Sequence, residues 1–327
     1  MSKVEIVERT IESKDSPVMP YHITAFAPMA EKVRAHFGAT DLDAIFGNYL
    51  KWSSLKFPMN PIGPDLARDE FGVIWRTNPN NRGNVIEHPM KEPDLRLFEM
   101  PEYPFDQMLE TLRNGLAQSA EYYNVVWSGD LLERALMLRG MVEGLVDLYE
   151  NPEFMHSLLE KLTQIVLAKI RTTESLDNQA VFLSDDYGCQ RGLMIGRGMW
   201  LEFIKPHFKT IVDCAHECGK KFFLHSDGDI SELIPDFIEL GVDVLHPMQP
   251  EAMDLPAIRR EYGKDICFYG GIGTQGYLRS GTPEDVVREI RALKSVGPSF
   301  ILAPVLQLLE DIPFENVLAM LDVLRES

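Results

Sequence analysis

The sequence has no apolar run near the roughly 20 residues that a membrane-spanning helix needs, although 45% of its 327 residues are hydrophobic. Its first residues, Met-Ser-Lys-Val-Glu-Ile-Val-Glu-Arg, lack the apolar core of a secretory signal. We therefore expect a cytoplasmic protein that neither spans a membrane nor is anchored to one. Its four cysteines are then expected to be reduced thiols.

Positive charge is also scarce, with 32 Lys and Arg against 50 Asp and Glu and a formal net charge of −18. Nucleic acids and anionic lipids are bound by concentrated positive surface. We therefore expect no nucleic-acid or membrane partner, although an isolated basic pocket is compatible with this balance. A Gly-rich phosphate loop and a nucleophile elbow are also absent.

From about residue 117, apolar strand-like runs alternate with amphipathic segments of helical length, which is typical of parallel strands joined by crossover helices. The predicted strands are 125–127, 181–183, 221–224, 242–245, 266–269 and 300–302. The predicted helices are 130–140, 145–149, 152–172, 200–218, 231–240, 253–262, 282–293 and 313–325. The pattern favours an α/β fold, a (β/α)8 TIM-type barrel, as one domain over 1–327.

Residues 1–116 are less regular and form an N-terminal extension in this interpretation, followed by regular strand–helix units over 117–327. Helices are predicted at 30–36 and 41–50. Pro and Asn cluster between 58 and 105, so the remainder is predicted to form an extra hairpin or a cap over the barrel mouth.

The apolar run that ends in His225 and Asp227 is the most informative stretch. Barrel enzymes place their chemistry where strands end. Because the two residues are separated by one position, both side chains can point into the same space while Ser226 points away. They could be two metal ligands or an acid–base pair. Asp185 and Asp186 end the preceding strand; two close carboxylates disfavour each other's ionisation, which suits proton donation, but they could equally cap the next helix.

Further polar and aromatic residues follow other strands, and they are candidates for substrate binding because they converge on one rim. Trp127, Tyr187 and Tyr269 could line an aryl pocket or simply pack in the core. The remaining candidates are Asp185, Arg191, His246 and Gln249. By contrast, Cys214, His216 and Cys218 share an outer helix without a second zinc-binding pair, so packing is favoured for them.

With these residues in order, the chain resembles the uroporphyrinogen decarboxylase superfamily, and most closely its corrinoid-linked methyltransferase branch. The resemblance covers most of the chain. Its motifs are Asp-Glu-Phe-Gly-Val-Ile-Trp at 69–75, Glu-Arg at 133–134, Leu-Arg-Gly at 138–140, Asp-Asp-Tyr-Gly at 185–188, Gln-Arg-Gly at 190–192, His-Ser-Asp-Gly at 225–228, His-Pro-Met-Gln-Pro-Glu at 246–251, Gly-Gly at 270–271 with Thr-Gln at 274–275, and Ile-Pro with Glu-Asn-Val at 312–317. It implies a (β/α)8 barrel and a methyltransferase that moves methyl from a small O-methylated compound, including methoxyaromatic ones, to a separate corrinoid-binding protein.

The departures from the family pattern narrow this expectation. Porphyrinogen decarboxylases carry an Arg-rich N-terminal segment, and only Arg34 lies between 17 and 36 here. The zinc methyltransferases have Cys where Asp227 stands, so a thiolate-rich zinc site is excluded. An oxygen-rich zinc site formed by His225, Asp227 and Glu310 remains, and its metal would act as a Lewis acid on an ether oxygen. Without a metal, Asp186 or Asp227 would protonate that oxygen.

Two other functions remain open at this point. A cofactor-free decarboxylase of a small carboxylic acid would need a cation near the Asp pair, and Arg191 is the candidate for that role. A non-catalytic binding protein that has lost its metal is the other alternative.

Overall fold

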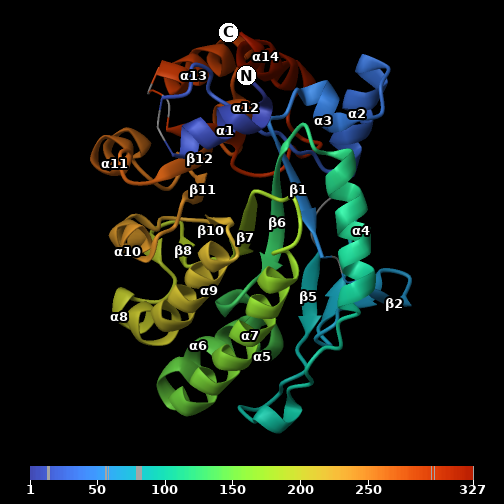
Figure 1. The fold of residues 1–327 in the computed structure, drawn as a ribbon, viewed down its shortest axis with the longest axis vertical. Coiled ribbons are helices and arrows are strands. Elements are labelled where there is room, and N and C mark those ends of the chain that lie inside the picture. The colour runs from blue at the N-terminus through green and yellow to red at the C-terminus, as the bar shows by residue number, and fades with distance from the viewer. Residues whose placement is uncertain are drawn as a thin grey trace.

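A parallel sheet of seven strands forms the centre of the computed structural model, which describes residues 1–12, 15–55, 57, 59–78, 83–295, 297 and 299–326 (Figure 1). Its strand order is β1-β6-β7-β10-β11-β12-β13, and every neighbouring pair is parallel. The strands are β1 (Leu50–Ser54), β6 (Tyr123–Gly129), β7 (Ala180–Ser184), β10 (Lys221–His225), β11 (Val244–Met248), β12 (Cys267–Ile272) and β13 (Phe300–Pro304). The predicted α/β class and the predicted strands are confirmed.

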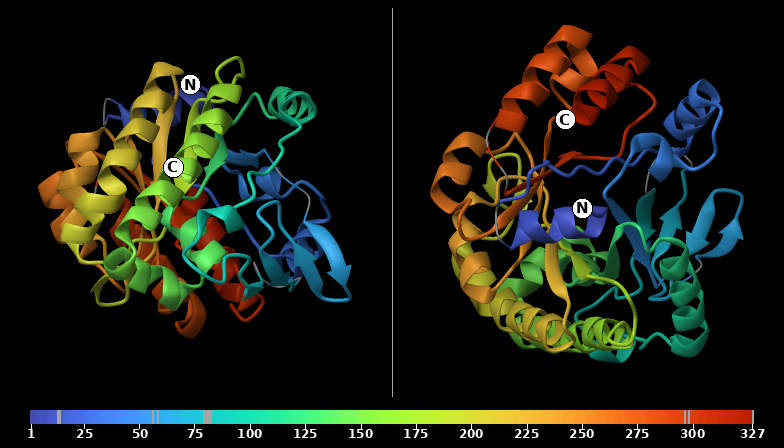
Figure 2. Two further views of the ribbon diagram at one scale, coloured as in Figure 1. Left: turned by 90° about the horizontal axis from the view of Figure 1, so that it is seen from below. Right: turned by 45° about the horizontal axis from the view of Figure 1, so that its top comes forward.

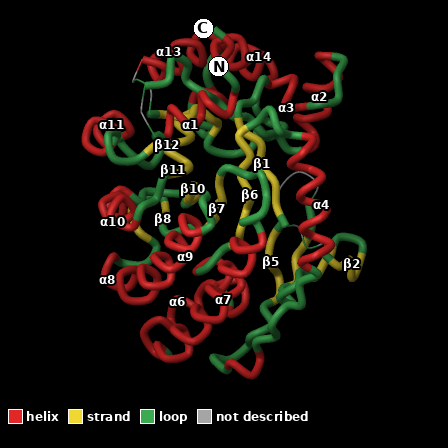
Figure 3. The backbone as a smooth tube through the Cα atoms, in the orientation of Figure 1, coloured by secondary structure: helices red, strands yellow, loops and turns green. Residues whose placement is uncertain are grey.

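Helices follow the strands and lie on the outside of the curled sheet, as the two views in Figure 2 and the tube in Figure 3 show. They are α5 (Leu132–Arg139), α6 (Met141–Glu150), α7 (Pro152–Thr172), α8 (Arg197–Met199), the π-helical turn η2 (Trp200–Ile204), α9 (Lys205–Glu217), the 3-10 turn η3 (Ser231–Leu233), α10 (Ile234–Leu240), α11 (Leu255–Tyr262), α12 (Tyr277–Ser280), α13 (Pro283–Ser295) and α14 (Phe314–Arg325). Local sequence sets several of their ends. At α13, for example, Asp285 N donates to Thr282 Oγ1 at 3.2 Å and Thr282 N donates to Asp285 Oδ2 at 3.0 Å, which is a reciprocal cap.

The first helix, α1 (Lys3–Ile11), covers the end of the sheet at which the strands begin. Its Val7 and Ile11 are buried in one cluster with inward-facing strand side chains. Ion pairs join α1 and the residue after it to strand starts, from Lys3 to Glu121 at 3.6 Å and from Glu12 to Lys221 at 3.1 Å. The opposite end, where the strands terminate, is therefore the end at which a site can open.

The segment 20–23 lies between the last and first strands of the sheet. Leu302 N of β13 donates to Pro20 O at 2.9 Å, and His22 N donates back to Leu302 O at 2.9 Å. On its other side, Tyr49 N donates to Tyr21 O at 3.1 Å, just before β1 begins. The segment thus links β13 to the start of β1 by backbone hydrogen bonds.

The N-terminal part also contains α2 (Ala27–Phe37), α3 (Leu42–Phe46), the turn η1 (Leu95–Leu97), α4 (Phe105–Gln118) and an antiparallel sheet of β2 (Asn60–Gly63), β3 (Leu66–Arg68), β4 (Ile74–Arg76) and β5 (Asn84–Glu87). The prediction of one helix over 41–50 is wrong beyond Phe46. Gly47 adopts a φ of 75°, which ends the helix, and the chain enters β1 at Leu50. Among the described residues no helix is long and apolar enough to cross a membrane.

Candidate active site

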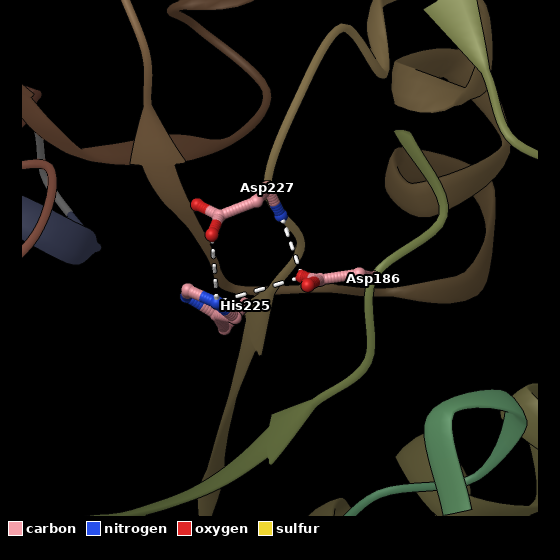
Figure 4. Close-up of side chains that lie close together, drawn as sticks. All are labelled: Asp186, His225 and Asp227. Atoms are coloured by element: carbon pink, nitrogen blue, oxygen red, sulfur yellow. Dashed lines mark hydrogen bonds and ion pairs between the residues drawn. The ribbon is translucent and has the colours of Figure 1, made fainter. Parts of the chain in front are cut away.

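Asp186, His225 and Asp227 meet where β7 and β10 end, each offering one ligand atom within 4.8 Å of the others (Figure 4). His225 Nε2 lies 3.6 Å from Asp186 Oδ1 and 3.9 Å from Asp227 Oδ2. Burial raises the pKa of Asp227 and the nearby Asp186 adds to the rise, whereas His225 opposes it. We call these three residues the Asp-His-Asp cluster.

Backbone contacts between the two strand-exit loops hold the cluster together. Asp227 N donates to Asp186 Oδ1 at 2.8 Å, and Tyr187 N donates to Ser226 Oγ at 2.8 Å. Gly228 adopts a φ of 85°, and a Cβ at that position would lie 2.5 Å from Cys189 N. Only glycine therefore allows the loops to approach this closely.

A second histidine supports His225 from inside the sheet. His225 Nδ1 and His246 Nδ1 lie 2.8 Å apart, so one of these two nitrogens must carry the proton between them. Burial, together with the charges of His225 and His22, holds the pKa of His246 well below its usual value. A neutral His246 can accept from His225 Nδ1–H and so leave His225 Nε2 unprotonated toward the carboxylates.

The support continues to the N-terminal segment. The rings of His246 and Tyr269 lie 4.5 Å apart, and Tyr269 Oη is 2.5 Å from His22 Nδ1. Burial lowers the pKa of His22 to about 4, so this histidine is neutral at physiological pH. The sequence pattern pointed to His246 and Tyr269 as substrate-binding candidates. In the structure His246 contacts His225, and Tyr269 contacts His246 and His22.

A cavity of about 1050 Å³ opens next to the cluster. Its wall adjoins the histidines, because the Trp52 ring lies 5.4 Å from the His246 ring and the Phe182 ring lies 6.0 Å from the His225 ring. Its described lining contains neither Lys nor Arg and consists of Trp52, Ser53, Ser54, Phe57, Pro104, Gln107, Met108, Thr111, Leu112, Gly115, Val125, Trp127, Phe182, Ser184 and Gln307. The cavity therefore suits a ligand with an apolar, ring-sized body.

A smaller cavity of about 200 Å³ has Asp227 in its wall. Gln249 also lines it and accepts a hydrogen bond from Gly228 N at 3.3 Å. This places the predicted Gln249 beside the Asp-His-Asp cluster.

Asp185 has a structural role instead of the predicted role in substrate binding. Its carboxylate accepts backbone hydrogen bonds from Leu131, Leu132 and Glu133 at 3.2, 2.9 and 2.7 Å, at the start of α5. Burial raises the pKa of Asp185 to about 7, while the donors at Glu133 and Leu132 oppose the rise. Asp185 therefore caps the start of α5, which is the second of the two roles that the sequence allowed.

Tyr187 does not line the large cavity. Its side chain is 0% exposed and packs against the rings of Trp200, Phe208 and Phe237, in the layer between sheet and helices. The reason is strand alternation, since the chain turns Asp186 toward the cluster and its two neighbours away from it. The packing alternative is therefore the one that the structure shows.

Arg191 and Glu310 are both exposed. Arg191 is exposed between β8 (Gly188–Cys189) and β9 (Gly192–Leu193). Glu310 is exposed and forms an ion pair with Lys32 at 3.7 Å. Within the described part of the chain, Asp186 completes the group of candidate ligands, and Glu310 does not belong to it.

A buried ion network fixes the antiparallel sheet near the large cavity. Arg134 Nη1 is 2.7 Å from Asp69 Oδ2, and Arg134 Nε is 2.9 Å from Asp130 Oδ1. Asp69 also accepts from Phe71 N, Val73 N and Trp75 Nε1. The 69–75 motif is thus a turn that docks onto α5.

Sequence reasoning missed most of the large cavity. Trp52 and Phe182 occupy inward positions of β1 and β7, and Met108 and Leu112 come from α4. The periodic signal was present in α4, whose buried Met108, Leu112 and Leu116 recur every four residues.

Comparison with known proteins agrees with this architecture. A family model described as uroporphyrinogen decarboxylase (URO-D) matches residues 134–327, which is more than half of the chain. A solved methyltransferase from Methanosarcina mazei is similar with a TM-score of 0.74 and 13% identity, over 99% of this chain and 98% of that one. A glycosylated endo-β-1,4-xylanase from Gloeophyllum trabeum has a TM-score of 0.42 and 10% identity, over 73% of this chain and 84% of its own. No curated protein sequence matches this chain. At 13% identity the likeness to the methyltransferase concerns the fold.

Proposed function

The chain belongs to the uroporphyrinogen decarboxylase family, and from this premise we propose that it is a methyltransferase that moves methyl from a small O-methylated compound to a corrinoid on a separate protein. The observation that carries the proposal is the Asp-His-Asp cluster beside a large apolar cavity. The fold shared with a methyltransferase over nearly the whole chain supports it.

We also propose that Asp186, His225 and Asp227 hold zinc. One imidazole nitrogen and two carboxylate oxygens within 4.8 Å are a suitable donor set, because catalytic zinc commonly has three protein ligands and an open position. Bound there, zinc would supply Lewis acidity toward an ether oxygen. The role of His246 is then to keep the Nδ1 proton of His225 in their shared hydrogen bond.

The protein's own groups do the rest of the chemistry in this proposal. The rings of Trp52 and Phe182 orient the donor with its ether oxygen toward the cluster and exclude water. Transfer of the methyl group to the partner's corrinoid would break the carbon–oxygen bond and leave its electron pair on the oxygen. Asp227, whose pKa is raised by burial, is placed to give that oxygen a proton if no metal is bound.

The complete barrel belongs to the same proposal. The segment 20–23, bonded to β13 on one side and to the start of β1 on the other, would serve as the eighth strand. His22 would then be an inward residue of that strand, which agrees with its contact with Tyr269.

The decarboxylase alternative has less support. It relied on Arg191 as the cation near the Asp pair, and Arg191 is exposed in the 188–193 hairpin. The residues that the structure describes around the large cavity likewise include no Lys or Arg.

Metal content and reaction class test the proposal directly. Zinc is measured in purified wild type, in His225→Ala and in the control His216→Ala, whose ring pairs with Asp243 on the outside of the fold. We expect stoichiometric zinc in wild type and the control and its loss in His225→Ala. Retained zinc in His225→Ala would exclude His225 as a ligand, and a metal-free, fully active wild type would exclude the Lewis-acid role.

The second assay follows methyl transfer from methoxyaromatics to reduced cobalamin, alongside carbon dioxide release from the matching carboxylic acids. Methylcobalamin formation that depends on His225 is the expected result. Carbon dioxide release without methyl transfer would favour the decarboxylase.

A further inference from the structure

Lys169, on α7, is a buried cation that the proposed chemistry does not use. Its residue is 3% exposed, and its Nζ lies 4.9 Å from the ring centre of Tyr103 and 5.1 Å from that of Trp127. Among the described residues, no side chain or carbonyl accepts a hydrogen bond from this ammonium, and no carboxylate lies within ion-pair distance. The aromatic faces attract the charge but leave its three N–H donors unused.

Tyr103 has the same deficiency. Its hydroxyl is buried and has no hydrogen-bond partner in the described part of the chain. Its ring packs edge-on against Phe57 at 5.1 Å, and Phe57, Pro104 and Trp127 all line the large cavity. The Lys169 ammonium and the Tyr103 hydroxyl therefore belong to neighbouring side chains, each packed against a residue of the cavity lining. A buried hydroxyl without a partner, such as that of Tyr103, is costly and is expected where a ligand supplies the missing atom.

We propose that Lys169 and Tyr103 form an anion-binding subsite, which takes the carboxylate of an aromatic acid whose ring lies against Trp127. This inference rests on the proposed function in that the large cavity is taken as the pocket of the methyl donor. The donor is then an acidic aromatic ether, bound through an ammonium and a phenol hydroxyl.

Neighbouring charges limit the ligand to one negative charge. Arg134 is committed to Asp69 and Asp130, with which it forms contacts of 2.7 and 2.9 Å. Glu70 already faces this cation: burial lowers the pKa of Lys169 and Glu70 opposes that change, while burial raises the pKa of Glu70 and Lys169 opposes that rise. The cation at the subsite is thus Lys169, and a second carboxylate on the ligand would find no further counter-ion among these groups.

Removing the two groups should cost the free protein little, because neither gives up a hydrogen bond. Lys169 gives up its attraction to the rings of Tyr103 and Trp127 and to the carboxylate of Glu70. Lys169→Met and Tyr103→Phe are therefore expected to unfold close to the temperature at which wild type unfolds. A functional cost without a stability cost distinguishes a ligand-binding residue from a structural one.

Calorimetric titration of the full chain with para-methoxybenzoate and with its uncharged amide tests the subsite. We expect wild type to bind the acid at least about tenfold more tightly than the amide, and Lys169→Met to lose this preference. Tyr103→Phe should reduce it severalfold. Lys161→Met is the matched control, because Lys161 is on the same helix with its Nζ 6.0 Å from the Phe98 ring, and it should keep the preference.

Equal affinity of wild type for acid and amide, or an unchanged preference in Lys169→Met, would overturn the inference. Should Lys169→Met fail to fold, Tyr103→Phe provides the same comparison by loss of one hydroxyl. Binding is read without methyl transfer, so the two proposals fail separately. Acid-selective binding without methylcobalamin formation would refute the proposed function alone, and equal rates on acid and amide would refute the subsite alone.

Discussion

Replacing Arg134 with methionine tests how the N-terminal sheet is held against the barrel. The side chains of Arg134, Asp69 and Asp130 are only 7%, 6% and 5% exposed. Burial alone would lower the pKa of Arg134, but the carboxylates of Asp130 and Asp69 raise it, so the guanidinium stays charged. Removing it leaves two carboxylates buried together. Breaking a buried ion pair by deleting one partner costs about 3–5 kcal/mol, and we expect a loss of that size in the free energy of unfolding near pH 7.

Urea unfolding followed by circular dichroism measures this loss, with Arg288→Met as the control. Arg288 forms the same kind of pair with Asp285, but its side chain is 63% exposed, so its removal should change stability little. A loss no greater than that of Arg288→Met would refute the reasoning.

Three further predictions concern the site and its frame. His246→Phe removes the ring nitrogen 2.8 Å from His225 Nδ1 and should weaken zinc binding by about 10–100-fold. Competition with a chromogenic chelator measures this affinity. An unchanged affinity would contradict the role of His246 in orienting His225. Gly228→Ala places a Cβ 2.5 Å from backbone atoms of Gly188 and Cys189 and should lower both thermal stability and zinc content. Zinc content equal to that of wild type would show that close contact between the two loops is not needed to hold the cluster. Burial raises the pKa of Asp185 in the folded protein to about 7. The stability that protonated Asp185 contributes is therefore present at low pH and is lost as the pH rises through about 7. The stability of wild type minus that of Asp185→Asn should therefore fall from pH 4 to pH 7.5, and a rise would show that the backbone donors keep Asp185 ionised.

The regular half of the fold could be predicted because parallel strands are buried on both faces and read as continuous apolar runs. Phe222, Phe223 and Leu224 form such a run, and it ends at the two residues that the site uses. The pairing of His225 with Asp227 followed from the two-residue period alone. The same period, applied to β7, separates Asp186 from Asp185 and Tyr187, so the sequence already contained the distinction that the structure makes.

The N-terminal part could not be predicted in the same way. β1 reads Leu-Lys-Trp-Ser-Ser, and only Leu50 in it is buried, so the strand has no apolar run. Its Trp52 becomes a cavity wall only because α4 and β6 pack beside it. The position of Glu310 likewise depends on its contact with Lys32, which is 278 residues away in the chain.

The two polar ends of the cavity wall set the direction in which a donor can bind. At one end, Lys169 lies 5.1 Å from the Trp127 ring, and Trp127 is the register partner of Phe182 in the next strand. At the other end, the Phe182 ring is 6.0 Å from the ring of His225. In the metal-free protein, an aromatic acid bound the wrong way round would bring its carboxylate to two aspartates, whereas with zinc in place the charge of the ion offsets theirs. In both cases the proposed orientation pairs the carboxylate with the ammonium of Lys169 and presents the ether to the cluster. The methyl group would thus be placed at the Asp-His-Asp cluster by the anchor at the far end of the donor, without any residue that recognises the methyl itself.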